Sequence, residues 1–224
     1  MLGQLPAPPS SAGFPSSYPY AYSGPLPSAI LRPLQQPLYD TELTTAAGTP
    51  NMIQFFQRQL GQTTAAGALV KTLAETNLSQ PGQLANPLEF SLFGFTFNTA
   101  PAPGTAFVTQ ADFADIMGAS VFTFLYTGNR VYLQIPLNRI PQGVKPEGFS
   151  ALDNAAAPDE RTQIGNGVGH ISNFYKFTIG RSALRIRPTE SFQARVDWPT
   201  AAPTIVATSV RLQVHLLGLQ WTPL

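Results

Sequence analysis

The sequence predicts an all-β protein: an antiparallel β-sandwich, a jelly roll of about eight strands, with one short helix and an extended N-terminal arm. Three observations lead to this fold class. Apolar and polar residues alternate over short runs, which is the period of a half-buried strand. The 22 prolines and 18 glycines place turn signals between these runs. Apolar residues make up 43% of the 224 residues, enough to fill a core between two sheets.

The first 37 residues differ from the rest in composition and are predicted to form an arm ahead of a sandwich domain over 38–224. They hold nine prolines, which exclude a helix and a central strand, and their only charged side chain is Arg32. An extended segment with interleaved aromatic rings can become ordered by docking on a neighbouring subunit. A free tail is the alternative. If the arm docks, we expect its anchors to be Phe14, Tyr18, Tyr20, Tyr22 and Arg32.

Two long strands are predicted to change their inward face. In the strand over 88–97, apolar residues stand at even positions up to Leu92 and at odd positions from Phe95. A strand switches faces only by inserting an extra residue, so a β-bulge is expected near Phe93-Gly94. The closing strand shows the same change of phase, and Gly218 marks it.

The clearest hairpin joins the strands over 120–127 and 130–137. Gly128-Asn129 between them is typical of a two-residue turn. The outward face then pairs Leu125 with Tyr132 and is only half polar, so we expect another surface to cover it. On the inward face the same turn pairs Tyr126 with Val131, Phe124 with Leu133, and Phe122 with Ile135.

The remaining elements follow from caps, turns and periodicity. A helix is expected over 109–117, where Thr109 is the N-cap and Asp112 takes the capping-box position. A connection without secondary structure is expected over 138–172, and a loop of this length is often functional. Further strands are expected at 38–43, 52–57, 173–179, 184–187, 191–198 and 204–219, with 184–187 and 191–198 forming a second hairpin that pairs Ile186 with Phe192 and Leu184 with Ala194.

Charged residues are scarce. They make up 11% of the chain, against about 25% in a typical soluble domain, and the net charge is +1. No global field therefore steers the chain to nucleic acid or to an anionic membrane. Ten of the thirteen basic residues are Arg, which interfaces enrich, so we expect copies of the chain or partners to cover much of the surface. A secreted or low-charge bacterial protein with a neutral polar surface is the alternative. The strand-face residues expected at these interfaces are Leu125, Tyr132, Arg185, Arg187, Arg195 and Arg211, the arginines pairing with a neighbour's carboxylates.

Residues that carry metal or thiol chemistry are few. The chain has no cysteine, which excludes disulfides, thiolate metal sites and cysteine nucleophiles. His170 and His215 are the only histidines, too few for a histidine-based metal cluster on facing strands. Asp153, Asp159 and Glu160 match the spacing of no known cation loop. We therefore expect no metal site.

Motifs for catalysis are equally weak. The glycine-rich run 165–170 precedes a strand, whereas a phosphate-binding loop follows a strand and begins a helix. Asp112 and Asp115 lie at the start of the expected helix, where acidic residues favour the helix dipole. These patterns predict a protein without catalytic residues, cofactor or small-molecule substrate, and thus not an enzyme.

The N-terminus does not resemble a targeting signal. Residues 1–6 lack the basic region of a secretory signal, and prolines interrupt every apolar run nearby. No stretch reaches the roughly 18–20 apolar residues of a membrane-spanning helix. We therefore expect the chain to be made in the cytoplasm.

The arrangement resembles the single jelly-roll capsid proteins of icosahedral viruses and phages. The features that carry the resemblance are the proline-rich arm over 1–37, the strands from Leu38 to Leu219, the helix over 109–117 and the long connection over 138–172. The run from Glu75 to Leu84 also resembles stretches in uncharacterised phage-like proteins. The resemblance implies a closed symmetric shell whose subunits exchange arms, located in the virion.

The resemblance also implies partners. Family members that package naked genomes often carry a basic arm, which this chain lacks. Direct genome contact is therefore doubtful, which leaves room for an internal membrane or another lining layer. Copies of the chain itself and other structural proteins are the remaining expected partners. Two alternatives stay open: a bacterial surface-fibre or appendage subunit that donates its arm as a strand, and a carbohydrate-binding module that uses Tyr132 or Trp221 as a stacking platform.

Overall fold

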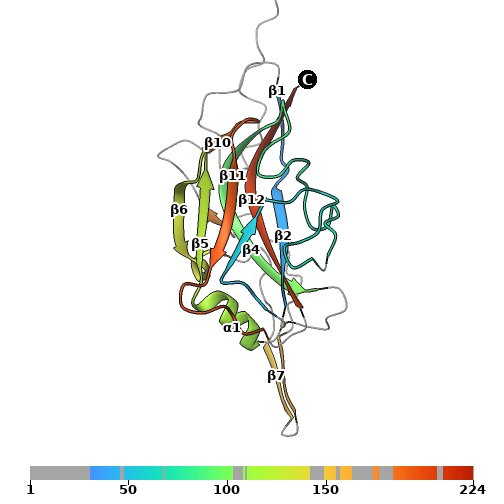
Figure 1. Cartoon of the computed structure of the whole chain (residues 1–224), viewed down its shortest axis with the longest axis vertical. Helices are drawn as coiled ribbons and strands as arrows, with labels where there is room; N and C mark the ends of the chain where they lie inside the picture. The colour runs from blue at the N-terminus through green and yellow to red at the C-terminus, as the bar shows by residue number, and fades with distance from the viewer. Residues whose placement is uncertain are drawn as a thin grey trace, which may run out of the picture.

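The computed structural model describes residues 31–45, 48–67, 69–102, 108, 110–141, 149–154, 157–162, 174–176, 184–205 and 209–223. These residues form the all-β sandwich that the sequence predicts, with two antiparallel sheets facing each other (Figure 1). Sheet A contains β1 (Leu31–Leu34), β2 (Leu38–Thr45), β4 (Glu89–Pro101), β9 (Tyr175–Lys176), β10 (Leu184–Ile186) and β12 (Ser209–Pro223). Sheet B contains β3 (Met52–Phe55), β5 (Val121–Tyr126), β6 (Arg130–Pro136) and β11 (Phe192–Asp197).

The strand order is that of a jelly roll. We count eight positions along the chain, with β9 and β10 sharing the sixth because both pair with β4. β1 and a separate hairpin, formed by residues 149–154 and 157–162, are left aside. Sheet A then has the order 1-8-3-6, through β2-β12-β4-β10, and sheet B the order 2-7-4-5, through β3-β11-β5-β6. The first and last positions are neighbours, as in the double Greek key that defines this fold.

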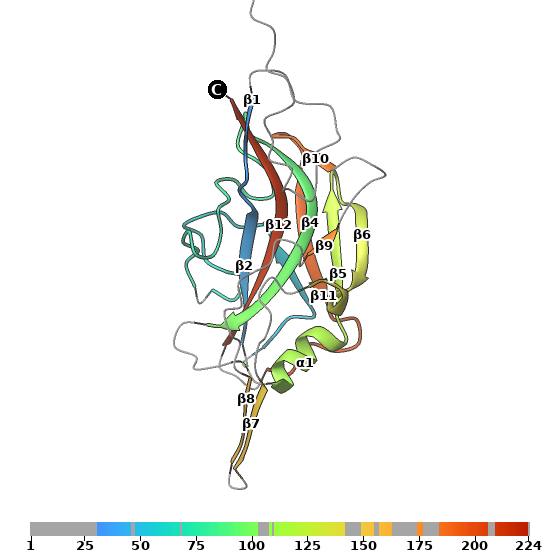
Figure 2. The same cartoon turned by 180° about the vertical axis from the view of Figure 1, so that it is seen from behind.

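The core lies between the two sheets and is rich in phenylalanine. Phe95 of sheet A contacts Phe122 and Phe124 of sheet B, with ring centroids 5.3 and 5.1 Å apart. Helix α1 (Gln110–Gly118) closes the lower end (Figure 2). It buries Ile116, whose carbonyl oxygen accepts a hydrogen bond of 3.1 Å from the indole of Trp198. The predicted helix is thus confirmed, and its apolar side faces the core.

The predicted bulge in β4 is confirmed. Leu217 of β12 lies opposite Gly94, whereas Gly218 lies opposite Leu92, so Phe93 is the extra residue. The predicted change of face in β12 is wrong, because β12 has no extra residue and its even positions face the core throughout. Gly218 instead permits a close approach, because a Cβ there would lie 2.7 Å from the ring of Phe90 and would overlap a backbone oxygen of β4.

The β5–β6 hairpin is confirmed, but its predicted register near the turn is wrong. Phe124 lies opposite Leu133 as predicted, whereas Tyr126 lies opposite Arg130 and Leu125 opposite Val131. A three-residue turn takes the place of the two-residue turn, with positive φ at Thr127, Gly128 and Asn129. A bulge restores the register, and it turns Tyr132 toward the core, where its ring lies 5.4 Å from that of Tyr126.

The predicted second hairpin does not form. β10 pairs with β4 in sheet A, whereas β11 pairs with β3 and β5 in sheet B. A turn in which the backbone N–H of Glu190 donates to the carbonyl of Arg187, over 3.1 Å, carries the chain from one sheet to the other. The inward residues of β11 agree with prediction, since Phe192, Ala194 and Val196 are buried.

Three further segments differ from the predicted outline. The connection over 138–172 contains a hairpin, β7 (Phe149–Asn154) with β8 (Ala157–Thr162), which projects below α1 (Figures 1 and 2). A short 3-10 helix, Leu137–Arg139, precedes it. Residues 31–34, placed in the arm by their prolines, form β1 and pair with β12. A strand of this kind can contain Pro33 because it lies at a sheet edge.

Candidate functional site

One rim of the sandwich is closed by the long connection between β3 and β4, residues 56–88, which we call the rim loop. β2 is an edge strand of sheet A and β3 is an edge strand of sheet B, and both lie at this rim (Figure 1). Inside the loop, the N–H of Gly61 donates to the carbonyl of Lys71, and the N–H of Lys71 donates to the carbonyl of Gln62, both over 2.8 Å. This local pairing fixes the backbone of Lys71 within the rim loop, which is joined to β2 by a bridge between Thr76 and Asp40.

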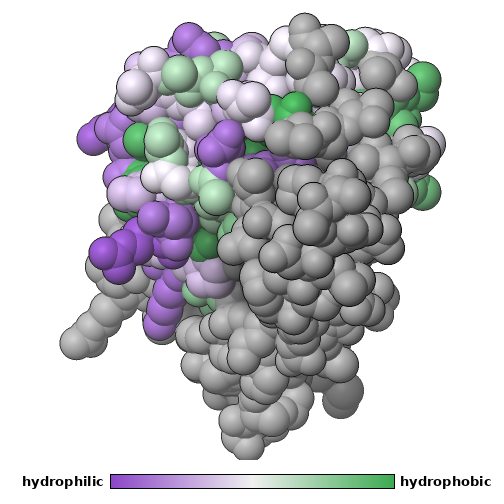
Figure 3. All heavy atoms as spheres, turned by 90° about the horizontal axis from the view of Figure 1, so that it is seen from below, coloured by the Kyte–Doolittle hydropathy of each residue, from purple (hydrophilic) through white to green (hydrophobic). Residues whose placement is uncertain are grey.

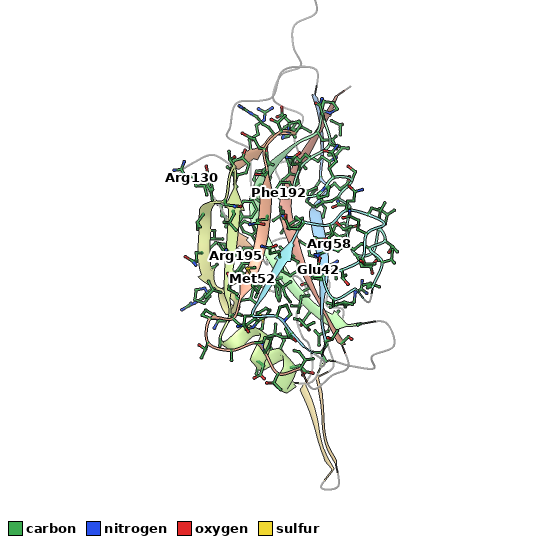
Figure 4. The ribbon with its side chains drawn as sticks, in the orientation of Figure 1. Glu42, Met52, Arg58, Arg130, Phe192 and Arg195 are labelled. Atoms are coloured by element: carbon green, nitrogen blue, oxygen red, sulfur yellow. The ribbon has the colours of Figure 1, made fainter. Side chains whose placement is uncertain are left out.

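Lys71 enters a buried cluster of charges. Its Nζ lies 2.7 Å from Asp40 Oδ1 and 2.7 Å from Glu42 Oε1, and all three side chains are fully buried. Arg58 adds a second cation, 3.6 Å from Glu42, and Figure 4 shows the two side chains beside β2. Asp40 and Glu42 stand on the inward face of β2, opposite Val214 and Leu212 of β12. The carboxylates therefore occupy core positions where, while ionised, they need a cation as partner.

The second oxygen of each carboxylate holds backbone from another element. Asp40 Oδ2 accepts a hydrogen bond of 2.6 Å from the N–H of Phe56, where β3 ends. Glu42 Oε2 accepts one of 2.7 Å from the N–H of Ala65 in the rim loop. Burial raises the pKa of Asp40 to about 6, while Lys71 and the Phe56 N–H act in the opposite direction. The cluster thus joins sheet A, sheet B and the rim loop.

Inward-facing charges on an edge strand also oppose pairing with another chain. β2 carries two of them, and the rim loop lies over the same strand. Sequence reasoning missed this cluster, although Asp40-Thr41-Glu42 breaks an otherwise apolar strand and Lys71 is one of only three lysines. The signal is present in β2, but its partner stands about thirty residues away, at a distance that periodicity does not reach.

The outer face of sheet A carries a second polar group around His215. Its Nε2 lies 2.9 Å from Gln213 Oε1 and 3.2 Å from Asn98 Nδ2, and its ring lies 5.8 Å from that of Tyr39. The hydroxyl of Tyr39 donates to the carbonyl of Leu73 in the rim loop. Burial lowers the pKa of His215 to about 4, so the ring is neutral at pH 7.

Acid should destabilise the protein through His215. Because its pKa is lower in the folded chain than the 6.5 of an exposed histidine, the stability it contributes is complete above pH 6.5 and is lost as the pH falls toward 4. The difference corresponds to about 3 kcal/mol. Urea unfolding at several pH values should show the wild type losing stability relative to His215→Gln over this range. Equal pH slopes for the two proteins would contradict the assignment.

The predicted arginine set is divided between the two sheets. Arg185 and Arg211 lie on the outer face of sheet A, where Arg185 pairs with Glu89 and Arg211 with Glu75. Arg195 lies on the outer face of sheet B and pairs with Asp197 over 2.9 Å. Each of these arginines therefore has a carboxylate partner in its own chain, and they do not form one basic stripe. Arg187 is exposed, and its backbone N–H donates to Glu190 over 2.9 Å.

Leu125 and Tyr132, predicted to share an outward face, are separated by the bulge in β6. Leu125 does face outward, yet it is only 4% exposed. It lines a shallow hollow of about 130 Å³ together with Pro81 and Gly82 of the rim loop and Gln193 of β11. Tyr132 turns inward instead, and the guanidinium of Arg130 lies 5.5 Å from its ring centre. The rim loop is thus what covers the half-polar face near Leu125.

The predicted arm anchors lie mostly outside the described residues. Four of the five anchors lie outside the described residues, namely Phe14, Tyr18, Tyr20 and Tyr22. The same holds for His170 and the glycine-rich run 165–170. The fifth anchor, Arg32, lies in β1 opposite Thr222 of β12. The arm therefore enters the sandwich beside the C-terminal strand, at the upper end in Figure 1.

The acidic residues weighed for chemistry lie in two places, helix α1 and the β7–β8 hairpin. Asp112 is buried and Asp115 is exposed, so the two meet different surroundings on α1. Asp153 lies opposite Pro158 in the β7–β8 hairpin, and Asp159 and Glu160 follow on β8. In the part of the chain that the structure describes, no three His, Asp or Glu side chains are grouped closely enough to hold a metal ion.

Over the same described ranges, no helix has the length and apolar character needed to cross a membrane. Comparison of the chain with protein-family models, with curated proteins and with solved structures finds no match.

Proposed function

We propose that this protein is a self-assembling structural subunit, the capsid protein of an icosahedral virus or phage, located in the virion. The sandwich is the rigid unit, its neutral surfaces contact other copies and other structural proteins, and the arm ties neighbours together. Burial of apolar surface at about 25 cal/mol per Å² drives association, and much of the gain is offset by lost rigid-body entropy. Many weak contacts per subunit then favour a closed, symmetric arrangement.

The proposal rests mainly on the positions of the few charged side chains. Asp40, Glu42, Glu75, Glu89 and Asp197 all pair with Lys or Arg of the same chain. These paired charges stabilise the subunit internally. The exposed charged residues of the described part are Asp115, Arg130, Arg139, Lys176 and Arg187, and its other exposed residues are neutral polar or apolar. Surfaces of this composition are typical of protein interfaces and unusual for a protein that stays monomeric.

The lower end of the molecule agrees with this proposal. Hydrophilic and apolar residues are interspersed on the described part of that surface, without a single large apolar patch (Figure 3). Interfaces that are not obligate have about the same apolar fraction as the remaining surface, so association through such a mixed surface needs several contacts at once. A lattice of identical subunits supplies them.

The two alternative functions have less support from the described residues. Trp221 is 3% exposed and donates to Ser91 Oγ over 2.9 Å, and Tyr132 packs between Tyr126 and Arg130. Neither ring presents the open face that sugar stacking needs. A donated strand requires a long run without proline, whereas residues 1–32 contain no such run longer than five residues.

The full chain should therefore form large particles when purified. We expect sedimentation velocity at physiological salt to show species far above the 24.1 kDa chain, and negative-stain electron microscopy to show particles of uniform diameter. A clean 24.1 kDa monomer at high concentration would overturn the proposed function.

Removing residues 1–30 should leave a folded sandwich that assembles poorly. This truncation retains β1, which belongs to sheet A, so circular dichroism should show an unchanged β signal. Sedimentation should show that most particles are lost. A full-length variant with Phe14, Tyr18, Tyr20 and Tyr22 changed to Ser is the matched control for arm length, and it should lose particles as well. Normal assembly of the truncated chain would refute the role of the arm.

A further inference from the structure

The rim opposite the charged cluster ends in an edge strand, β6. Within the described residues β6 pairs only with β5, and it lies at the outer limit of sheet B in both views (Figures 1 and 2). A seven-residue strand is about 24 Å long, and an edge strand presents a row of unpaired N–H and C=O groups along that length. β6 is therefore a template on which another strand can pair.

β6 lacks the features that protect the edge strands β2 and β3 from pairing with another chain. β2 carries Asp40 and Glu42 on its inward face and is covered by the rim loop, whereas β3 is only four residues long. The centre of β6, residues 131–135, contains no charge and no proline. Its one charged residue, Arg130, stands at the first position, over the ring of Tyr132, and its proline stands at the last. Natural edges usually carry a charge or a proline where they would otherwise pair.

The side chains of β6 are also incompletely buried. Leu133 and Ile135 face the core but stay only partly buried, because among the described strands none covers them on the open side. Val131 faces outward and is 50% exposed. A strand added at this edge would complete the burial of all three side chains while it satisfies the backbone groups of β6.

Two segments of this chain are candidates to pair with the edge of β6: the arm and the β6 strand of a second copy. The arm is poorly suited, because proline recurs at least every six residues through 1–33 and each proline removes a donor from the ladder. The β6 strand of a second copy is well suited, since its uncharged centre meets an identical uncharged centre without repulsion. Two antiparallel copies of one strand are self-complementary about a two-fold axis.

We propose that β6 is an interface between two copies of this chain, in which the two β6 strands pair antiparallel about a two-fold axis near Leu133. The pairing joins two copies of sheet B into one continuous sheet. This inference deepens the proposed function, because it names one contact between subunits, and it rests on that proposal for the second copy. Seven-residue strands bury less than the roughly 1,200 Å² of a stable interface, so the contact is weak outside a lattice. The test is therefore a covalent trap.

A single introduced cysteine provides this trap, since the chain has none. In the proposed pairing the two Gln134 residues are diagonal neighbours with Cβ atoms roughly 7–8 Å apart, which a short bis-maleimide spans. Gln134 is exposed and faces outward, so Gln134→Cys should not disturb the fold. We expect a cross-linked band at twice 24.1 kDa. Met52→Cys, exposed on the opposite edge of sheet B, is the matched control and should stay monomeric.

A lysine on the edge should abolish the contact. Gln134→Lys is combined with Val131→Cys as the reporter and with a longer bis-maleimide, because the two Val131 residues lie roughly 14 Å apart in the proposed pairing. The two lysines place like charges across the two-fold axis, so the cross-linked band should be lost. Asn138→Lys with the same reporter adds the same charge just beyond β6 and should retain the band. Equal cross-linking in the two lysine variants, or none at Gln134→Cys, would overturn the inference.

The remaining outcomes distinguish the β6 contact from the proposed self-assembly of the chain into particles. Cross-linking at Gln134→Cys should persist after residues 1–30 are removed. If it disappears, the arm is the occupant and the β6 pairing is wrong. Cross-linked dimers from a chain that forms no particles would overturn the proposed function and support the β6 contact. Particles that never cross-link through β6 would overturn only the β6 contact.

Discussion

Replacing Lys71 with Met should lower the free energy of unfolding by about 3–5 kcal/mol at pH 7, because two carboxylates then stay buried without their cation. Lys71 lies 2.7 Å from both Asp40 and Glu42, and all three side chains are inaccessible to water. Urea denaturation followed by fluorescence of the buried Trp198 measures the loss. The loss should be smaller at pH 5, since Asp40 has a pKa of about 6 and needs no cation once it is protonated.

Two variants show whether the loss comes from the buried charge. Arg58→Met removes the partly exposed cation 3.6 Å from Glu42 and should cost less than about 1 kcal/mol. Combining Lys71→Met with Asp40→Asn and Glu42→Gln removes every charge of the trio, and it should restore much of the stability. A Lys71→Met protein as stable as Arg58→Met would show that the cluster is not the element that closes the rim.

Local patterns predicted most of the strands and one of the two suggested bulges. Alternation identified the inward residues of β11, and the helix over 109–117 followed from its cap and apolar stripe, because both signals act between residues close in sequence. The bulge at Phe93 also has a local signature, namely the change from even to odd apolar positions. The same signature misled in β12, where Trp221 is buried on the outer face of sheet A instead.

Tertiary contacts decided what the sequence patterns left open. Gly128-Asn129 alone predicts a two-residue turn, but the hydroxyl of Tyr126 lies within hydrogen-bond distance of two acceptors, the carbonyl of Arg185 at 2.9 Å and the carboxylate of Glu190. These bonds hold Tyr126 inward, and a three-residue turn with a bulge accommodates it. The assignment of β10 and β11 to different sheets has no local signature, because the turn at 187–190 suits either a hairpin or a crossing between sheets.

The candidate site, too, could be predicted from the sequence only in part. The scarcity of charge and the proline-rich arm could be seen in the sequence, and they led to the proposal of a self-assembling subunit. The use of those charges could not be seen, since Arg211 and Glu75 pair across 136 positions of the chain. The open edge of β6 was equally hidden, because whether a strand is central or at an edge depends on the order of strands in the sheet.

Inserting a serine directly after Phe93 should prevent stable folding, because the bulge in β4 accommodates one extra residue and not two. Residues 94–101 would keep their pairing with β12, and Phe90 and Leu92 would then shift by one position and turn from the core to the outer face. Exposing two such side chains costs about 3–6 kcal/mol, comparable to the whole stability of many domains. Soluble yield and urea denaturation of the insertion variant measure this loss.

Phe93→Ala is the matched variant, because it retains the extra residue and removes only a half-buried ring. Its loss should stay below the roughly 3–5 kcal/mol of a fully buried phenylalanine. The alanine variant should therefore fold and unfold cooperatively while the insertion variant does not. If both variants had the same stability, β4 would tolerate a second extra residue opposite β12. Phe90, Leu92, Phe95 and Phe97 would then not need the fixed register that places them all in the core.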